Sequence, residues 1–71
     1  MNVFGYVVDS DDLSSLSEVT IQASPEELKR LSDFLLNCAN AMEKDEQWEH
    51  EHFQDVTGTD SGEPDLIVVA P

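Results

Sequence analysis

The sequence predicts a two-layer α+β domain in which a four-stranded, mainly antiparallel sheet carries one amphipathic helix on one face, in the order β-β-α-β-β. A helix-start signal followed by apolar residues at three- and four-residue steps occupies the middle of the chain. Segments of alternating or continuous apolar residues lie on both sides of it. A chain of 71 residues has room for one small domain, residues 1–71, with a thin core.

Two strands are predicted before the helix. Residues 3–9, VFGYVVD, are rich in β-branched and aromatic side chains and run into the turn-forming cluster DSDD. In residues 16–23, LSEVTIQA, the apolar Val19, Ile21 and Ala23 alternate with polar residues, as in a strand with one buried face. We expect these two strands to form an antiparallel pair.

The helix has the clearest signal in the chain. Ser24 is suited to the N-cap and Pro25 to the first helical position, while Glu27 can close a capping box with Ser24. The helix should end near Lys44, where a cation suits the negative end of the helix dipole. The predicted buried stripe consists of Leu28, Leu31, Leu35, Cys38 and Met42, flanked by Phe34, Ala39 and Leu36.

A third strand is predicted at residues 47–56 and a fourth at residues 65–70, separated by a polar loop at residues 57–64. The last run, DLIVVA, is nearly continuous in apolar residues and suits a central strand. Alternation along the third strand places Trp48, His50 and His52 on one face and Glu49, Glu51 and Phe53 on the other. A bulge near Phe53 would change that assignment.

Charge is the strongest compositional signal. Sixteen acidic residues oppose three basic ones, for a net charge of −13. Nucleic acid and anionic membranes should repel such a chain, so neither is expected as a partner. Lys29, Arg30 and Lys44 all lie in the predicted helix, which leaves the sheet and loops with acidic residues and no Lys or Arg.

The two histidines raise the question of a metal site. A His-x-His pair on a strand places both imidazoles on one face, within reach of one ion. A third ligand would have to come from elsewhere, such as Asp55, Asp9 or Asp12, and nothing in the spacing requires it. We therefore assign no metal ligand and no cofactor.

No catalytic residue is assigned either, and the chain is not expected to be an enzyme. Cys38 lies in the apolar stripe of the predicted helix, where a core role is expected. The serines near residue 15 lack a nucleophile-elbow pattern, and no glycine-rich phosphate loop follows a strand.

The expected location is the cytoplasm. The run LIVVA is far shorter than the roughly 20 apolar residues that span a bilayer. The amino terminus MNVFGYVVD does not resemble a secretory signal. A single cysteine, Cys38, cannot form an internal disulfide, which suits a reducing compartment.

The acidic third strand is the best candidate for a functional surface. An aromatic side chain beside carboxylates combines a possible anchor with long-range attraction for a basic protein. The candidate partner-binding residues are Trp48, Glu49, His50, Glu51, His52 and Asp55.

The run SEVTIQASPEELKRLSDFLLNCANAM, followed by EHEHF and by PDLIVV, resembles the immunity protein 32 family of bacterial polymorphic-toxin systems. The resemblance implies a small cytoplasmic protein that neutralises a toxin by binding it, without catalysis of its own. With the acidic surface, it suggests a basic toxin as the partner, a nuclease being a plausible case.

Two other functions are left open by the sequence. One is a small metal-binding domain that uses His50 and His52. The other is an acidic structural or regulatory module, whose apolar edge strand would pair with a second copy of the chain or whose acidity serves solubility alone. A homo-oligomer is compatible with the sequence but nothing in it indicates one.

Overall fold

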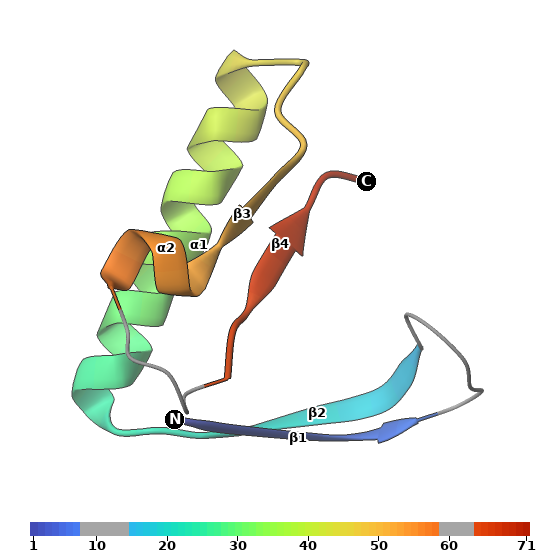
Figure 1. Ribbon diagram of the computed structural model, residues 1–71, viewed down its shortest axis with the longest axis vertical. Helices are drawn as coiled ribbons and strands as arrows, with labels where there is room; N and C mark the ends of the chain where they lie inside the picture. The colour runs from blue at the N-terminus through green and yellow to red at the C-terminus, as the bar shows by residue number, and fades with distance from the viewer. Residues whose placement is uncertain (8–14, 59–63) are drawn as a thin grey trace.

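The computed structural model of the chain describes residues 1–7, 15–58 and 64–71, and it confirms an α+β protein with one main helix (Figure 1). The elements are β1 (Asn2–Val7), β2 (Leu16–Gln22), α1 (Pro25–Lys44), β3 (His50–His52), α2 (Phe53–Thr57) and β4 (Ile67–Val69). In Figure 1 the β1–β2 hairpin runs across the amino-terminal end of α1, whereas β3 and β4 lie along the side of that helix.

The prediction of a single four-stranded sheet is wrong. Within the described ranges the strands form two separate two-stranded antiparallel sheets, β1–β2 and β3–β4. The run at residues 65–70 is consequently not a central strand, because in the described part of the chain β4 pairs with β3 alone.

The start and end of α1 are confirmed as predicted. The Ser24 side chain accepts a hydrogen bond from the backbone N–H of Glu27 at 3.1 Å, and the Glu27 carboxylate accepts one from the backbone N–H of Ser24 at 3.0 Å. The amino group of Met1 also lies 2.5 Å from Oε2 of Glu27. After Lys44, the Asp45 side chain accepts a hydrogen bond from the backbone N–H of Gln47 at 2.9 Å, which turns the chain toward β3.

The third strand is much shorter than the predicted residues 47–56. Only His50–His52 is extended, and the chain then enters the short helix α2. Phe53 and Val56 are three residues apart, a helical spacing that follows directly on the period-two pattern of β3. Gly58 ends α2 with φ 67°, a left-handed conformation that glycine adopts without steric cost.

The described core is small and centres on one stripe of α1. Leu31, Phe34 and Cys38 are buried there together with Phe53 of α2. The rings of Phe34 and Phe53 are 5.1 Å apart between centroids and tilted by 60°, a favourable arrangement for aromatic pairs. The partly buried residues packed against this cluster are Met1, Trp48, Leu66 and Val68.

The buried stripe is narrower than the predicted one. Leu28, Leu35 and Leu36 are 47%, 48% and 61% exposed. The physical reason is that a two-stranded sheet and one turn of helix cover less of α1 than a four-stranded sheet would. Leu28 and Leu35, which were predicted to lie in the stripe itself, therefore remain in contact with water, whereas Phe34, predicted to flank it, is buried.

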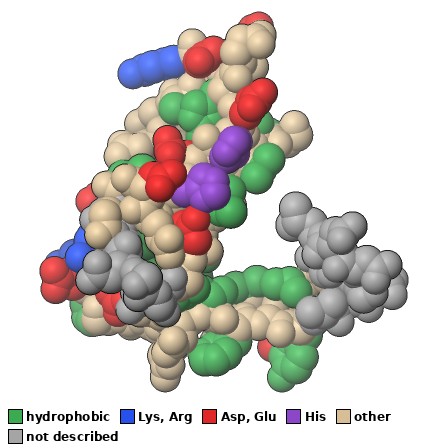
Figure 2. Space-filling view, in the orientation of Figure 1, with side chains coloured by type: hydrophobic (Ala, Val, Ile, Leu, Met, Phe, Trp, Pro, Cys, Tyr) green, Lys and Arg blue, Asp and Glu red, His purple; other side chains and the backbone are tan. Residues whose placement is uncertain are grey.

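The β1–β2 hairpin buries neither of its faces fully. The cross-strand pairs Val3↔Ile21 and Gly5↔Val19 share one face, which is apolar, and every residue of β2 is exposed. In Figure 2 the hairpin extends away from the rest of the molecule, with hydrophobic side chains visible on both of its sides. The predicted pairing of these strands is confirmed, but the face predicted to be buried is not.

Candidate protein-binding surface

The face of the β3–β4 sheet that points away from α1 brings histidines and exposed apolar side chains together. Directly paired residues of an antiparallel sheet share a face, and the pairs are His50↔Val69 and His52↔Ile67. Ile67 is 52% exposed and Val69 is 64% exposed. We call these four residues the outer face of the β3–β4 sheet.

The opposite face of the same sheet is turned toward the core. Glu51 pairs with Val68, and both side chains are partly buried, Val68 against the core cluster. The backbone N–H of Phe53 donates to the carbonyl of Leu66 at 2.8 Å, and that of Ala70 donates to the carbonyl of Glu49 at 2.9 Å. These bonds extend the pairing beyond both ends of the short strands and fix which side chains face outward.

Asp65 holds the His52 ring and the start of α2 at the same time. Its Oδ2 atom lies 2.6 Å from Nδ1 of His52, and its Oδ1 atom accepts a hydrogen bond from the backbone N–H of Gln54 at 3.0 Å. A carboxylate can only accept, so Nδ1 of His52 is the protonated nitrogen. Asp65 belongs to the segment just before β4, so its hydrogen bond to Gln54 connects that segment to α2.

These contacts shift the pKa values of both partners. The hydrogen bond to Asp65 is the main cause that raises the pKa of the His52 imidazole, and the charges of Asp65, Asp55 and Glu51 act in the same direction. The hydrogen bond from Gln54, followed by that from His52, lowers the pKa of the Asp65 carboxyl. Both shifts favour the charged forms.

The two histidines lie close to each other without an assembled metal site in the described part of the chain. Their ring centroids are 5.4 Å apart with the rings edge to face. Among the described residues no group of three potential ligands is placed to hold an ion. Two of the candidate third ligands, Asp9 and Asp12, lie outside the described residues.

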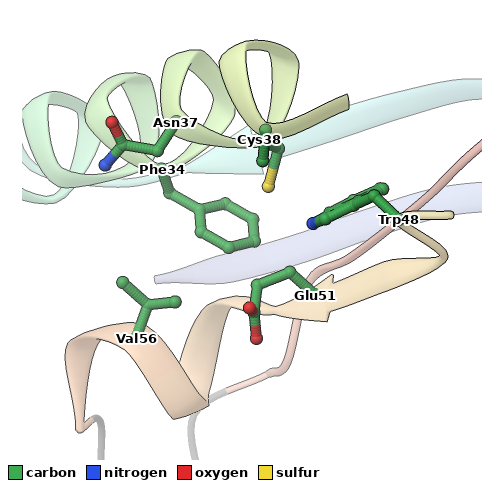
Figure 3. Close-up of a pocket in the computed structure, with 7 residues that line it drawn as sticks. Phe34, Asn37, Cys38, Trp48, Glu51 and Val56 are labelled. Carbon is green, nitrogen blue, oxygen red and sulfur yellow. The ribbon is translucent and has the colours of Figure 1, made fainter. Parts of the chain in front are cut away.

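The structure divides the predicted site residues between two surfaces. His50 and His52 belong to the outer face, and the exposed Glu49 and Asp55 lie on either side of them along the chain. Trp48 does not share the face of the histidines, because it precedes the strand and packs against the core cluster. Together with Glu51 it lines a pocket on the inner side of the sheet (Figure 3).

The sequence analysis did not predict three residues at this site, namely Ile67 and Val69 of the outer face and Asp65, which contacts His52. Asp65, Ile67 and Val69 belong to the run that was predicted to be a central strand. In an edge strand, alternate residues face water, and here the exposed Ile67 and Val69 flank the partly buried Val68. The sequence signal for an exposed strand at this position is Asp65, the acidic residue directly before the apolar run.

Figure 2 shows how charge is distributed over this side of the molecule. Acidic side chains and the two histidines gather over β3 and α2, whereas the basic side chains in view lie toward the margins. All three basic residues belong to α1. The outer face is thus an exposed apolar and histidine surface in an acidic setting.

The comparison with known families shows to which family the chain belongs. A family model described as immunity protein 32 matches residues 18–71, about three quarters of the chain. The chain belongs to the immunity protein 32 family. Searches among curated proteins and among solved structures gave no significant match.

The span matched by the immunity protein 32 model contains both surfaces described above. It covers most of β2 and all of α1, β3, α2 and β4, and it leaves out β1. The residues of the outer face and the residues that line the inner pocket are therefore all part of the shared family region. Within the described ranges, no helix of the chain is long and apolar enough to cross a membrane.

Proposed function

We propose that this immunity protein neutralises a cognate basic toxin by binding it directly, and that the outer face of the β3–β4 sheet is the contact surface. The observation that carries the proposal is an exposed apolar pair, Ile67 and Val69, beside two histidines in a family of immunity proteins. Exposed apolar side chains inside a polar rim are typical of interface centres.

Charge supports a basic partner. The net charge is −13, and the residues next to the outer face along the chain, Glu49, Asp55 and Asp65, are acidic and exposed. Such a field accelerates encounter with a cationic protein and makes association sensitive to salt. A toxin with a basic active site, as a nuclease has, would be covered by a surface that mimics the charge of its substrate.

The mechanism requires no reaction by the immunity protein. Binding alone would block the toxin, and the proposal assigns neither a catalytic residue nor a cofactor to the chain. We also propose a cytoplasmic location, where the free and buried thiol of Cys38 would remain reduced.

The test begins with capture of the toxin and ends with inhibition. The chain serves as bait in a lysate of its source organism, and a basic protein released by moderate salt is purified and assayed for toxicity with and without the immunity protein. The expected result is loss of the toxic activity at a one-to-one ratio. A captured protein that stays fully active in the complex would overturn the proposal.

A matched pair of variants then tests the surface. Glu49→Lys reverses a charge next to the outer face, and Glu26→Lys makes the same change in the first turn of α1. Glu49→Lys should slow association and reduce its salt dependence more than Glu26→Lys does. Equal effects would show that net charge matters and that the outer face is not the contact.

A further inference from the structure

The inner side of β3 is hollowed into a pocket of about 270 Å³. Its walls come from four parts of the chain: α1, the turn before β3, β3 itself and α2 (Figure 3). The volume lies just below the range of about 300–1,000 Å³ for drug-sized ligands, so the pocket suits one side chain better than a metabolite. The residues that line it include Phe34, Asn37, Cys38, Trp48, Glu51 and Val56.

Glu51 supplies a negative charge to this largely apolar pocket. Its Oε1 atom accepts a bond from the backbone N–H of His52 at 3.2 Å, and no Lys or Arg side chain in the described residues forms an ion pair with it. After burial, the Glu51 carboxylate is the second cause that raises the pKa of the Cys38 thiol, which lines the same pocket. A carboxylate that is partly withdrawn from water gains most from a cation placed beside it.

Trp48 offers the second element of recognition. The partly buried side chain packs against the core cluster and lines the same pocket as Glu51. Figure 3 shows the indole below α1 and the Glu51 side chain on the same side of β3, with its carboxylate turned toward α2. A cation near an indole face is attracted by the ring quadrupole, and guanidinium does this while also pairing with a carboxylate.

We propose that this pocket receives an arginine side chain of the toxin. The guanidinium would pair with Glu51 and lie against Trp48, and the aliphatic stem would contact Phe34 and Val56. An anion would be repelled by Glu51, and a neutral apolar side chain would leave the carboxylate desolvated and unpaired. A lysine ammonium is a strongly hydrated point charge and lacks the planar surface that stacks on a ring.

This inference rests on the proposed function, since it names what the toxin contributes. It also places a contact on the inner side of β3, apart from the outer face. Only β3 separates the outer face from the pocket, so one partner bound at the edge of β3 would contact both.

The pocket can be tested without the toxin. Trp48 is the single tryptophan of the chain, and its indole N–H resonance reports on the pocket directly. The probe is N-acetyl-arginine amide, and the matched control ligand is N-acetyl-citrulline amide, which has a similar shape without the charge. The expected result is a saturable shift of the Trp48 resonance with the arginine compound alone.

Two isosteric variants locate the effect. Glu51→Gln should abolish the shift, and Glu49→Gln should retain it, because Glu49 does not line the pocket although it carries the same charge two residues away. The proposal is overturned if the citrulline compound shifts Trp48 equally, if neither compound does so up to its solubility limit, or if both variants respond alike.

The same variants separate this inference from the proposed function once the toxin is in hand. Glu51→Gln should raise the dissociation rate by roughly 30-fold or more, since it leaves a buried guanidinium unpaired, whereas Glu49→Gln should act mainly on the association rate. A toxin that is inhibited by both variants with equal dissociation rates would eliminate the pocket and leave the proposed function standing. A chain that inhibits no toxin would eliminate the function, while the arginine titration would still test the pocket.

Discussion

The Nδ1 atom of His52 lies 2.6 Å from the Oδ2 atom of Asp65, and the other oxygen of that carboxylate holds the backbone N–H of Gln54 at the start of α2. One side chain therefore joins the segment before β4 to both β3 and α2. Because β3 and β4 are only three residues long, this polar contact matters for the register that keeps Ile67 and Val69 exposed.

Replacement of Asp65 should lower the pKa of His52. Asp65→Asn removes the carboxylate that is the first cause of the raised value, so the pKa should fall toward the ordinary value of 6.5. Asp55→Asn is the matched control, since Asp55 acts only through its charge and should produce a smaller change. Titration of the His52 ring resonances by NMR measures both, and equal shifts in the two variants would contradict the assignment.

The same pair predicts a window of pH for stability. The raised pKa of His52 contributes stability that is fully present below 6.5 and is lost as pH rises through its folded-state value. The lowered pKa of Asp65 contributes stability that is present above 3.8 and is lost as pH falls through its folded-state value. The urea midpoint of the wild type should thus exceed that of Asp65→Asn most between these two pH values.

Glu27 should produce a different acid dependence. Its hydrogen bond to the Met1 amino group, followed by that to the Ser24 backbone, lowers its pKa from 4.5 to about 2. The resulting stability is present above pH 4.5 and is lost as pH falls toward about 2. Glu27→Gln keeps a capping-box side chain and removes the charge, so its deficit in urea midpoint should shrink over that interval.

The control for this prediction is Glu26→Gln. It makes the same change of charge one residue earlier in the first turn of α1, outside the capping box. Its difference from the wild type should stay small and should not follow the same pH profile. A deficit of Glu27→Gln that persists unchanged at pH 2 would show that the charge of Glu27 is not involved.

The parts of the fold that local chemistry determines were predictable. Ser24, Pro25 and Glu27 specify the start of α1 through hydrogen bonds within one turn, and the structure has them as expected. The hairpin pairing of β1 with β2 was also predictable from the two strand patterns. The number of sheets was not, because alternation marks an apolar face without saying what covers it. Val19 and Ile21 follow the strand pattern and remain 55% and 41% exposed.

The candidate site was predictable in composition but not in geometry. Within the acidic stretch around His50 and His52, Glu49, His50 and Asp55 are exposed, whereas Trp48, Glu51 and His52 are partly buried. Trp48 and Glu51 separate from the histidines because the extended segment starts at His50 and its alternate residue, Glu51, turns toward the core. Asp65 is thirteen residues from His52 in the sequence, and no local sequence pattern predicts a contact between residues so far apart in the chain.

The small core makes Phe34 the most sensitive apolar position. It is 2% exposed and stacks at a tilt on Phe53. Phe34→Ala should cost about 3–5 kcal/mol, whereas a domain of this length has a total stability of roughly 4–11 kcal/mol. Leu36→Ala is the control on the same helix, where the side chain is 61% exposed, and should change stability by about 0.5 kcal/mol or less. Urea unfolding followed by circular dichroism measures both, and similar costs would contradict the assigned core.

Replacement of either of two glycines by alanine should lower the stability, for different reasons. The segment in which hydrogen exchange accelerates distinguishes the two cases. A Cβ atom on Gly5 would lie 2.8 Å from Cδ1 of Leu16 and 3.0 Å from the carbonyl oxygen of Glu18. The Leu16 side chain can rotate away, but the Glu18 carbonyl oxygen belongs to the backbone of β2 and cannot move without displacing that strand. Gly5→Ala should therefore cost roughly 1–3 kcal/mol and accelerate hydrogen exchange in the hairpin.

At Gly58 the space is open and the backbone is the obstacle. Beyond the chain neighbours of Gly58, no atom of the described residues lies within 4 Å of the Cβ position, but φ is 67°. Gly58→Ala should cost about 1–2 kcal/mol and accelerate hydrogen exchange in α2, and Gly58→Asn should cost less because asparagine tolerates this conformation.

A double variant tests the reason given for Gly5. Adding Leu16→Ala to Gly5→Ala should recover only part of the lost stability, since the contact with the Glu18 carbonyl remains. Full recovery in that double variant would show that the leucine side chain alone excludes a larger residue from position 5.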